Sequence, residues 1–221
     1  MNPQKYVFFD FDNTLAKGDS VIPFLFFCLK GRYTSVCHLF RIAGAWIVNR
    51  IHQSDNLIPV KETTFSFLKG MSQADIDCIC IDFVDRVLSK RLYAQGIAEM
   101  RRLKDQGYKV CVVSASSDLY MKHISRILPV DYVISTECKF SDGKYTGTMG
   151  PNCKGEEKKR RILETFNKLP CPDHCICYGD SESDAPMLDL GHIQCLVNPH
   201  GNSLTGKYPN AEIKKWKVKR K

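Results

Sequence analysis

Four carboxylates and one hydroxyl stand in the sequence just after short apolar runs, where buried strands would end. These residues are Asp10, Asp12, Ser114, Asp180 and Asp184. Carboxylates that share a site oppose one another's ionisation, and a divalent cation removes that conflict. Because clustered oxygen ligands suit Mg²⁺, the pattern predicts a magnesium site.

A lysine is available to the same site from the basic stretch of residues 154–159. A carboxylate nucleophile, a second carboxylic acid two residues later, a hydroxyl, a lysine and Mg²⁺ are together suited to phosphoryl transfer. The metal and the lysine neutralise the phosphate, so that an anionic nucleophile can approach it. An isolated Asp-x-Asp pair would indicate only a turn with helix-capping residues. The combination with the later residues is what favours catalysis.

The elements that would position these residues alternate between strand and helix. Apolar runs predict strands at residues 6–9, 109–113, 132–134, 175–178 and 195–197. Helical patterns lie between them at residues 97–106, 118–128 and 156–169. This alternation indicates an α/β fold with a doubly wound parallel sheet, which binds ligands beyond the carboxyl ends of its strands. Asp142-Gly143 predicts a hairpin turn at the edge of this core.

Residues 17–93 depart from the alternation and read as helices throughout. The helical patterns cover residues 21–29, 34–50, 56–69 and 72–93, and Ser72 is the expected N-cap of the last. We therefore predict a helical cap inserted after the first strand. Residues 1–16 and 94–206 would form the α/β core, and residues 207–221 a basic tail.

Composition supports a single globular domain with a smaller inserted lobe. The chain has 221 residues, of which 43% are hydrophobic and 25% charged, and this excludes global disorder. No stretch of 18 residues lacks a charge, and an acidic residue already stands at position 10, so we expect a cytoplasmic protein. The tail carries seven Lys or Arg against one Glu, within a net charge of +8. We expect a solvated terminus there, with contact to an anionic membrane as the alternative, and no nucleic-acid partner.

The chemistry-bearing residues resemble the four motifs of the haloacid dehalogenase superfamily of phosphatases. The similarity lies in Asp10-Phe-Asp-Asn-Thr-Leu15, in Val112-Val-Ser114, in a lysine at a helix start and in Gly179-Asp180-x-x-x-Asp184. The motifs follow the family's order over residues 6 to 190. The helical insertion resembles the cap of the phosphoserine-phosphatase-like branch, subfamily IB. The resemblance implies a Rossmann-like core and Mg²⁺-dependent hydrolysis of a phosphomonoester.

The resemblance also implies a role for each motif residue. Asp10 would be the nucleophile that forms an aspartyl-phosphate, and Asp12 the general acid and base. Asp10, the backbone carbonyl of Asp12 and Asp180 would hold Mg²⁺, and Asp184 would orient the metal's ligands. Ser114 would bind a phosphoryl oxygen.

Two lysines compete for the phosphate-binding role. Lys154 looks locally like the motif of some family members. Lys158 stands 22 residues before Asp180, a spacing that resembles the family better. We therefore predict Lys158 and treat Lys154 as part of a solvated helix face.

The cap residues bear on the substrate. In the family's phosphoserine phosphatases a glutamate and a cap arginine bind the amino acid. By resemblance, Asp19 stands here at the position of the glutamate, and Thr63-Thr64 stand where the arginine would be expected. The incomplete match favours a different small phosphorylated metabolite, with Asp19 in the substrate site. The choice between a phosphatase and a phosphotransferase, and the oligomeric state, stay open.

The apolar residues 21–51 are interrupted by four cations, Lys30, Arg32, Arg41 and Arg50, and allow two interpretations. We expect these apolar residues to pack the cap's own helices. The alternative is a membrane-facing surface that presents the site to a lipid headgroup phosphate, as in related phosphatidylglycerophosphate phosphatases. A catalytically silent binding module with the same fold is the third possibility.

Overall fold

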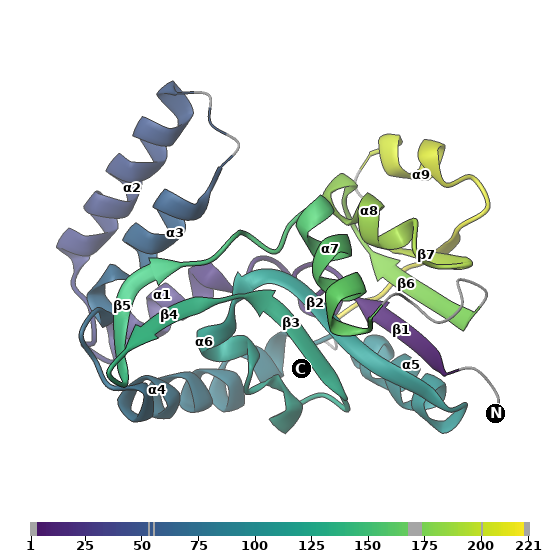
Figure 1. The fold of residues 1–221 in the computed structure, drawn as a ribbon, viewed down its shortest axis with the longest axis horizontal. Helices are drawn as coiled ribbons and strands as arrows, with labels where there is room; N and C mark the ends of the chain where they lie inside the picture. Colours follow the sequence, from purple (N-terminus) through teal and green to yellow (C-terminus); the bar gives the residue numbers. More distant parts are fainter. Residues whose placement is uncertain (1–3, 53, 55, 168–173, 200, 219–221) are drawn as a thin grey trace.

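The computed structural model describes residues 4–52, 54, 56–167, 174–199 and 201–218. Its centre is a six-stranded sheet in the order β3-β2-β1-β6-β7-β8, with parallel pairing throughout (Figure 1). The strands are β1 (Lys5–Phe9), β2 (Tyr108–Ser117), β3 (Tyr132–Thr136), β6 (Cys175–Gly179), β7 (Ile193–Val197) and β8 (Glu212–Lys214). The predicted doubly wound α/β fold is confirmed. From β1 the following strands β2 and β3 are added toward one edge of the sheet, and from β6 the strands β7 and β8 are added toward the other edge.

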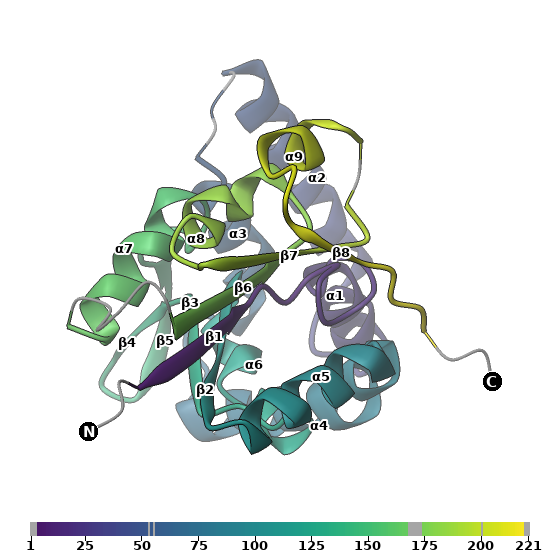
Figure 2. The same cartoon turned by 90° about the vertical axis from the view of Figure 1, so that its right-hand side faces the viewer.

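Alternating burial along β1 defines the two faces of the sheet. Val7 and Phe9 pack into one hydrophobic cluster and Phe8 into the other, because successive side chains of a strand point to opposite faces. The first cluster includes side chains of α5 (Ala94–Asp105) and α6 (Asp118–Met121). The second includes side chains of α7 (Glu156–Thr165), α8 (Ala185–Leu188) and α9 (Ser203–Lys207). Figure 2 shows the sheet between these two groups of helices.

The inserted segment after β1 is helical, as predicted. It contains α1 (Val21–Lys30), α2 (Val36–Ile51), α3 (Ile58–Phe65), α4 (Gln73–Arg86) and the 3₁₀ turns η1 (Ser66–Leu68) and η2 (Leu88–Arg91). Ser72 caps α4 by accepting a hydrogen bond from the backbone of Asp75. Phe24 lies 5.1 Å from Phe83 and 5.3 Å from Tyr120 between ring centroids. These rings join the cap's core to α6, next to the sheet.

The Asp142-Gly143 hairpin lies against the cap. Strands β4 (Cys138–Ser141) and β5 (Lys144–Met149) pair antiparallel around this turn, whose two residues have φ of 50° and 70°. The backbone of Gly70 donates to the Tyr145 carbonyl at 2.8 Å, and Tyr145 donates to the Met71 carbonyl at 3.0 Å. The hairpin falls in the part of the sequence predicted as core, yet its backbone is hydrogen-bonded to the helical insertion.

Two predicted elements of the core differ in length. The helix expected at residues 118–128 is only α6 followed by the 3₁₀ turn η3 (Ile124–Arg126). The consecutive side chains Leu119, Tyr120 and Met121 are all fully buried, and a regular surface helix cannot bury three neighbours on one face. Strand β2 continues beyond Val113 to Ser117, so that Ser114 lies inside a strand rather than after its end.

The expectation of a solvated tail is wrong for its first part. Residues of β8 pair with β7, and the Trp216 ring stacks on Tyr178 with centroids 6.0 Å apart. The backbone of Trp216 also donates to the side chain of Asn198 at 3.0 Å. Edge pairing and one buried aromatic ring therefore hold this basic segment. Residues 219–221 lie outside the described part, as does the end of the predicted helix 156–169.

Within the described residues, we find no helix with both the length and the apolar character needed to cross a membrane.

Candidate active site

The two central strands bring the first and last acidic motifs together. The backbone of Asp10 donates to the Tyr178 carbonyl at 2.9 Å, which extends the pairing of β1 with β6 by one residue. Asp10 and Asp180 therefore lie side by side, directly after the carboxyl ends of β1 and β6. This is the point where the strand order reverses, and open α/β sheets bind their ligands there.

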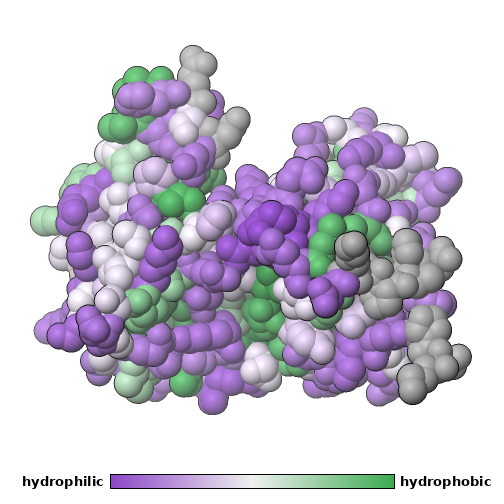
Figure 3. All heavy atoms as spheres, in the orientation of Figure 1, coloured by the Kyte–Doolittle hydropathy of each residue, from purple (hydrophilic) through white to green (hydrophobic). Residues whose placement is uncertain are grey.

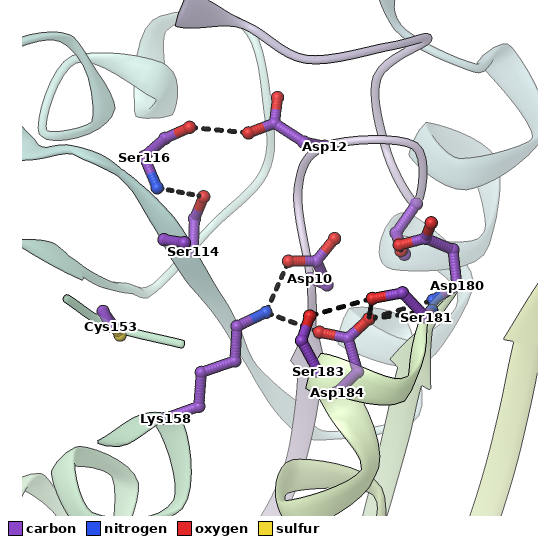
Figure 4. A network of polar contacts seen from close by, with 12 residues as sticks. Asp10, Asp12, Ser114, Ser116, Cys153, Lys158, Asp180, Ser181, Ser183 and Asp184 are labelled. Carbon is purple, nitrogen blue, oxygen red and sulfur yellow. Dashed lines mark hydrogen bonds and ion pairs between the residues drawn. The ribbon is translucent and has the colours of Figure 1, made fainter. Parts of the chain in front are cut away.

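Three carboxylates and one ammonium form the centre of the site (Figure 4). Asp10, Asp180 and Asp184 are buried, and each offers an oxygen that lies within 4.8 Å of the others. Lys158, in the first turn of α7, donates from Nζ to Asp10 Oδ1 at 2.5 Å and to Asp184 Oδ1 at 2.7 Å. Lys154 is exposed. The structure thus places Lys158, and not Lys154, among the carboxylates.

Backbone amides fix the position of Asp184. Its Oδ2 accepts hydrogen bonds from the amides of Asp180 at 3.2 Å and Ser181 at 3.1 Å. Gly179 makes the approach possible, because a Cβ on that residue would lie 2.6 Å from the Cβ of Asp184. The glycine before Asp180 is therefore a packing requirement of the site.

The carboxylates outnumber the cation in this buried cluster. Burial raises the pKa of Asp10 well above its usual value, even though the Lys158 ammonium opposes the rise. Burial and the neighbouring Asp184 raise the pKa of Asp180 to about 7. Burial would raise the pKa of Asp184 too, but Lys158 and the backbone donors bring it below the usual value. An oxygen-only donor set with excess negative charge fits Mg²⁺.

Asp12 points away from this cluster, toward β2. Its Oδ2 accepts hydrogen bonds from the hydroxyls of Ser116 at 2.6 Å and Ser20 at 3.2 Å (Figure 4). Its Oδ1 is buried and has no hydrogen-bond partner among the described residues. Burial and nearby Asp19 raise the pKa of Asp12 to about 6. Since the side chain lies outside the acidic triad, only the backbone carbonyl of Asp12 is left for the predicted metal role.

Comparison with known proteins agrees with this architecture. The model of the haloacid dehalogenase-like hydrolase family matches residues 7–189. The chain belongs to that family. CicA of Caulobacter vibrioides is 31% identical over 83% of this chain and 82% of its own length. A phosphoserine phosphatase of a Polaromonas species is 33% identical over 56% of this chain and 52% of its own length.

A solved structure shares the fold over nearly the whole chain. This Bordetella pertussis protein, described as having unknown function, matches with a TM-score of 0.85 and 21% identity over 97% of this chain and 99% of its own. The family match and the phosphoserine phosphatase relative together identify the chain as a phosphatase of the phosphoserine-phosphatase-like branch of the haloacid dehalogenase superfamily.

The other two predicted site residues of this haloacid dehalogenase-like chain are Ser114 and Asp19, and they differ in burial. Ser114 is buried, and its Oγ accepts a hydrogen bond from the backbone of Ser116 at 3.0 Å, so its hydroxyl proton stays available. Asp19 is exposed, and its Oδ1 accepts from the backbone of Val21 at 2.7 Å. Asp19 therefore satisfies the first backbone amide of α1, whose N-cap residue is Ser20.

A lysine of the cap reaches the same site, and sequence reasoning missed it. Lys61 on α3 donates from Nζ to the Ala115 carbonyl at 2.6 Å and to Asn152 Oδ1 at 2.5 Å. Both of these partners are neutral oxygens, and burial lowers the pKa of Lys61 to about 8, although Asp19 and Asp12 oppose the fall. Lys61 stands in a helix among polar and apolar neighbours, and no spacing rule singles it out. The hydroxyls of Ser20 and Ser116 were also missed, because no motif or spacing marks them in the sequence.

The crowded carboxylates predict a pH-dependent stability of the metal-free protein. The folded state keeps a proton on Asp180 up to a pKa of about 7, whereas the unfolded chain releases it near its ordinary value. The wild type should therefore lose stability relative to Asp180→Asn as the pH rises from about 4 to about 7, by up to about 4 kcal/mol.

Denaturant unfolding at a series of pH values, with EDTA or with Mg²⁺, measures this difference. Mg²⁺ should raise the midpoint of the wild type near pH 7 and raise that of Asp180→Asn much less. Equal pH slopes in the two metal-free proteins would contradict the raised pKa of Asp180. No effect of Mg²⁺ on either protein would show that the three carboxylates are not a metal site.

Proposed function

We propose that the protein is a Mg²⁺-dependent phosphomonoester hydrolase that acts on a small phosphorylated substrate through an aspartyl-phosphate at Asp10. The observation that carries this proposal is the meeting of three buried carboxylates and the Lys158 ammonium at the carboxyl ends of β1 and β6. A phosphate dianion needs positive charge, from Lys158 and from a cation that the carboxylates would hold, before an anionic nucleophile can reach it.

The proposed reaction has two displacements at phosphorus. In the first, a carboxylate oxygen of Asp10 forms a bond to phosphorus as the bond to the ester oxygen breaks, and Asp12 gives its proton to the departing oxygen. In the second, Asp12 takes a proton from water, whose oxygen bonds to phosphorus and releases Asp10 and inorganic phosphate. Ser114 and Lys158 bind the non-bridging phosphoryl oxygens in both steps.

Asp10, Asp180 and the backbone carbonyl of Asp12 would hold Mg²⁺, with Asp184 orienting the metal's ligands. When bound, the metal neutralises phosphoryl charge as a Lewis acid. Lys158 adds positive charge from the protein itself, and its two hydrogen bonds hold Asp10 and Asp184 in fixed positions. The burial of Asp12 supports its role, since a pKa of about 6 suits a group that both gives and takes a proton near neutral pH.

We also propose that residues 17–93 act as a cap over the core and that Lys61 is its contact with the substrate. A partly buried ammonium whose hydrogen-bond partners are a carbonyl and an amide oxygen retains uncompensated charge. A substrate with a second anionic group, a carboxylate or another phosphate, would supply that charge. This is consistent with a metabolite, and Asp19 lies close enough to influence the same lysine.

Replacing Lys61 tests this assignment. Lys61→Met should raise KM about tenfold for phosphate esters whose leaving group carries a carboxylate or a second phosphate, with kcat nearly unchanged. The leaving group of p-nitrophenyl phosphate carries no second anionic group. For this substrate the KM of Lys61→Met should stay within about twofold of the wild-type KM. Lys61→Arg should restore part of the loss. An equal rise of KM for both substrate types would assign Lys61 to cap structure instead.

Phosphate release with Mg²⁺ tests the function itself. The panel contains soluble phosphomonoesters and phosphatidylglycerophosphate in mixed micelles, with Asp10→Asn as the inactive control. We expect Mg²⁺-dependent turnover of one or more soluble esters that the control does not show. Turnover confined to the micellar lipid would favour a headgroup phosphatase, and silence on the whole panel from folded protein would favour a binding module.

A further inference from the structure

One side of α2 is apolar and faces outward. Val36, Phe40, Ile47 and Ile51 follow one another at helical positions i, i+4, i+11 and i+15, which places all four on one side of the helix. They are 56%, 74%, 57% and 71% exposed. Trp46, at the border of this stripe, is 54% exposed. We call the four stripe residues and Trp46 the apolar face of α2.

The opposite side of α2 holds the helix to the cap. His38 is buried, with Nε2 3.0 Å from the Thr64 carbonyl, and its ring lies 5.2 Å from that of Phe67. The packing of cap helices expected from the sequence is found for part of α1, where Phe24 and Cys28 are buried while Ile22 and Phe26 are exposed. It is not found for the apolar face of α2, and contiguous exposed apolar residues of this kind mark an interaction surface.

The position of α2 leaves this face accessible. Figure 1 shows α2 projecting away from the α/β core, with α3 beside it. In Figure 3 hydrophobic residues gather over the outer end of the same helix.

The segment that carries the apolar face holds only positive charge. Residues 20–52 contain Lys30, Arg32, Arg41 and Arg50 and no Asp or Glu. Arg41 and Arg50 are exposed and belong to α2 itself, one on each flank of the stripe. Apolar residues bordered by cations, without anions, complement a surface that has negative headgroups over hydrocarbon.

We propose that α2 docks on an anionic lipid bilayer and lies in the plane of its interface. At 16 residues the helix is too short to span the bilayer, and its cations would stay at headgroup level while the stripe enters the acyl boundary. A second copy of the chain fits this face less well, because pairing two such helices would bring their arginines together without acidic partners. The docking rests on the apolar face and not on the proposed reaction.

Trp46 provides a built-in probe of this contact. The other tryptophan, Trp216, is only 8% exposed and lies against Tyr178 in the α/β core. Transfer of Trp46 from water to the interface should shift its emission to shorter wavelength, whereas Trp216 should not respond. Trp46→Phe therefore reports the background of the measurement.

The experiment titrates the full chain with vesicles of phosphatidylcholine alone or with 30 mol% phosphatidylglycerol, and follows Trp46 emission and co-sedimentation. We expect a blue shift and pelleting only with the anionic vesicles, both weakened by added salt. Phe40→Glu with Ile47→Glu should abolish binding, and Arg41→Gln with Arg50→Gln should weaken it on the order of tenfold or more. Ile213→Glu, at an exposed apolar residue of β8, is the matched control and should bind like the wild type.

Circular dichroism and turnover of a soluble phosphomonoester establish that each variant is folded. The proposal is overturned if the wild type binds neither vesicle, if it binds both equally, or if Ile213→Glu loses binding as the α2 variants do. It is also overturned if sedimentation shows a dimer that Phe40→Glu with Ile47→Glu dissociates, because a second copy would then cover the face.

Discussion

Asp10→Asn should lower kcat/KM for every hydrolysed phosphomonoester by at least about 10⁴-fold. The amide cannot attack phosphorus as the carboxylate does, so the first displacement is lost and not merely slowed. Substrate binding should survive, because Ser114, Lys158 and the cap are unchanged. A steady-state assay with a sensitive phosphate detector measures the loss, and a competition assay with the best substrate measures the binding.

The control for this variant is the state of its fold. Asparagine has nearly the volume of aspartate, and its carbonyl oxygen can still accept the hydrogen bond that Lys158 donates at 2.5 Å. Removing one of three crowded carboxylates also relieves repulsion, so the thermal midpoint should not fall. Asp142→Asn, in the exposed hairpin turn, is the matched substitution and should keep full activity. Activity of Asp10→Asn above about 1% in a preparation free of other phosphatases would contradict the assignment.

Lys158→Met has the second largest expected effect, on activity and on stability together. The side chain is buried and donates to two carboxylates, so its removal leaves their charges uncompensated. We expect kcat/KM to fall about 10²- to 10³-fold through lost stabilisation of phosphoryl charge. Without metal the free energy of unfolding at pH 7 should fall by about 3 kcal/mol, as for other broken buried pairs.

Lys154→Met distinguishes the two lysines that the sequence left in competition. Because Lys154 is exposed, its loss should change activity by less than about twofold and leave the unfolding free energy unchanged. Mg²⁺ should restore part of the stability of Lys158→Met, since it supplies charge to the same carboxylates. If Lys154→Met is the inactive variant, the phosphate is bound at a different place from the cluster around Asp10.

The parallel sheet was predictable because its strands carry their signal locally. Residues such as Val7, Phe8 and Phe9 are β-branched or aromatic, are buried on both faces and stop abruptly at an aspartate. β8 gave no such signal, because it has three residues and its order depends on β7 and on the stacking of Trp216. The short α6 was also hidden, since burial on both sides follows from the cap that covers it and not from its own periodicity.

The acidic residues of the site could be predicted because strand ends in a parallel sheet converge on one edge. Lys61 could not, because its place depends on how α3 crosses to Ala115 and Asn152, which are 54 and 91 residues away in sequence. Ser116 was overlooked because β2 runs past Ser114 through small polar residues that read as a loop. The outward face of α2 likewise depends on which side of the helix packs on α3.

Trapping the phosphorylated enzyme tests the central claim most directly. The wild type is mixed with its best substrate and Mg²⁺ and quenched in acid within the first turnover. The protein is then digested, and the masses of its peptides are measured by mass spectrometry. We predict that the peptide containing Asp10 gains the mass of one phosphoryl group, that hydroxylamine removes it, and that Asp10→Asn shows no gain. A phosphoryl group on another residue, or full turnover without any phosphorylated peptide, would contradict the account.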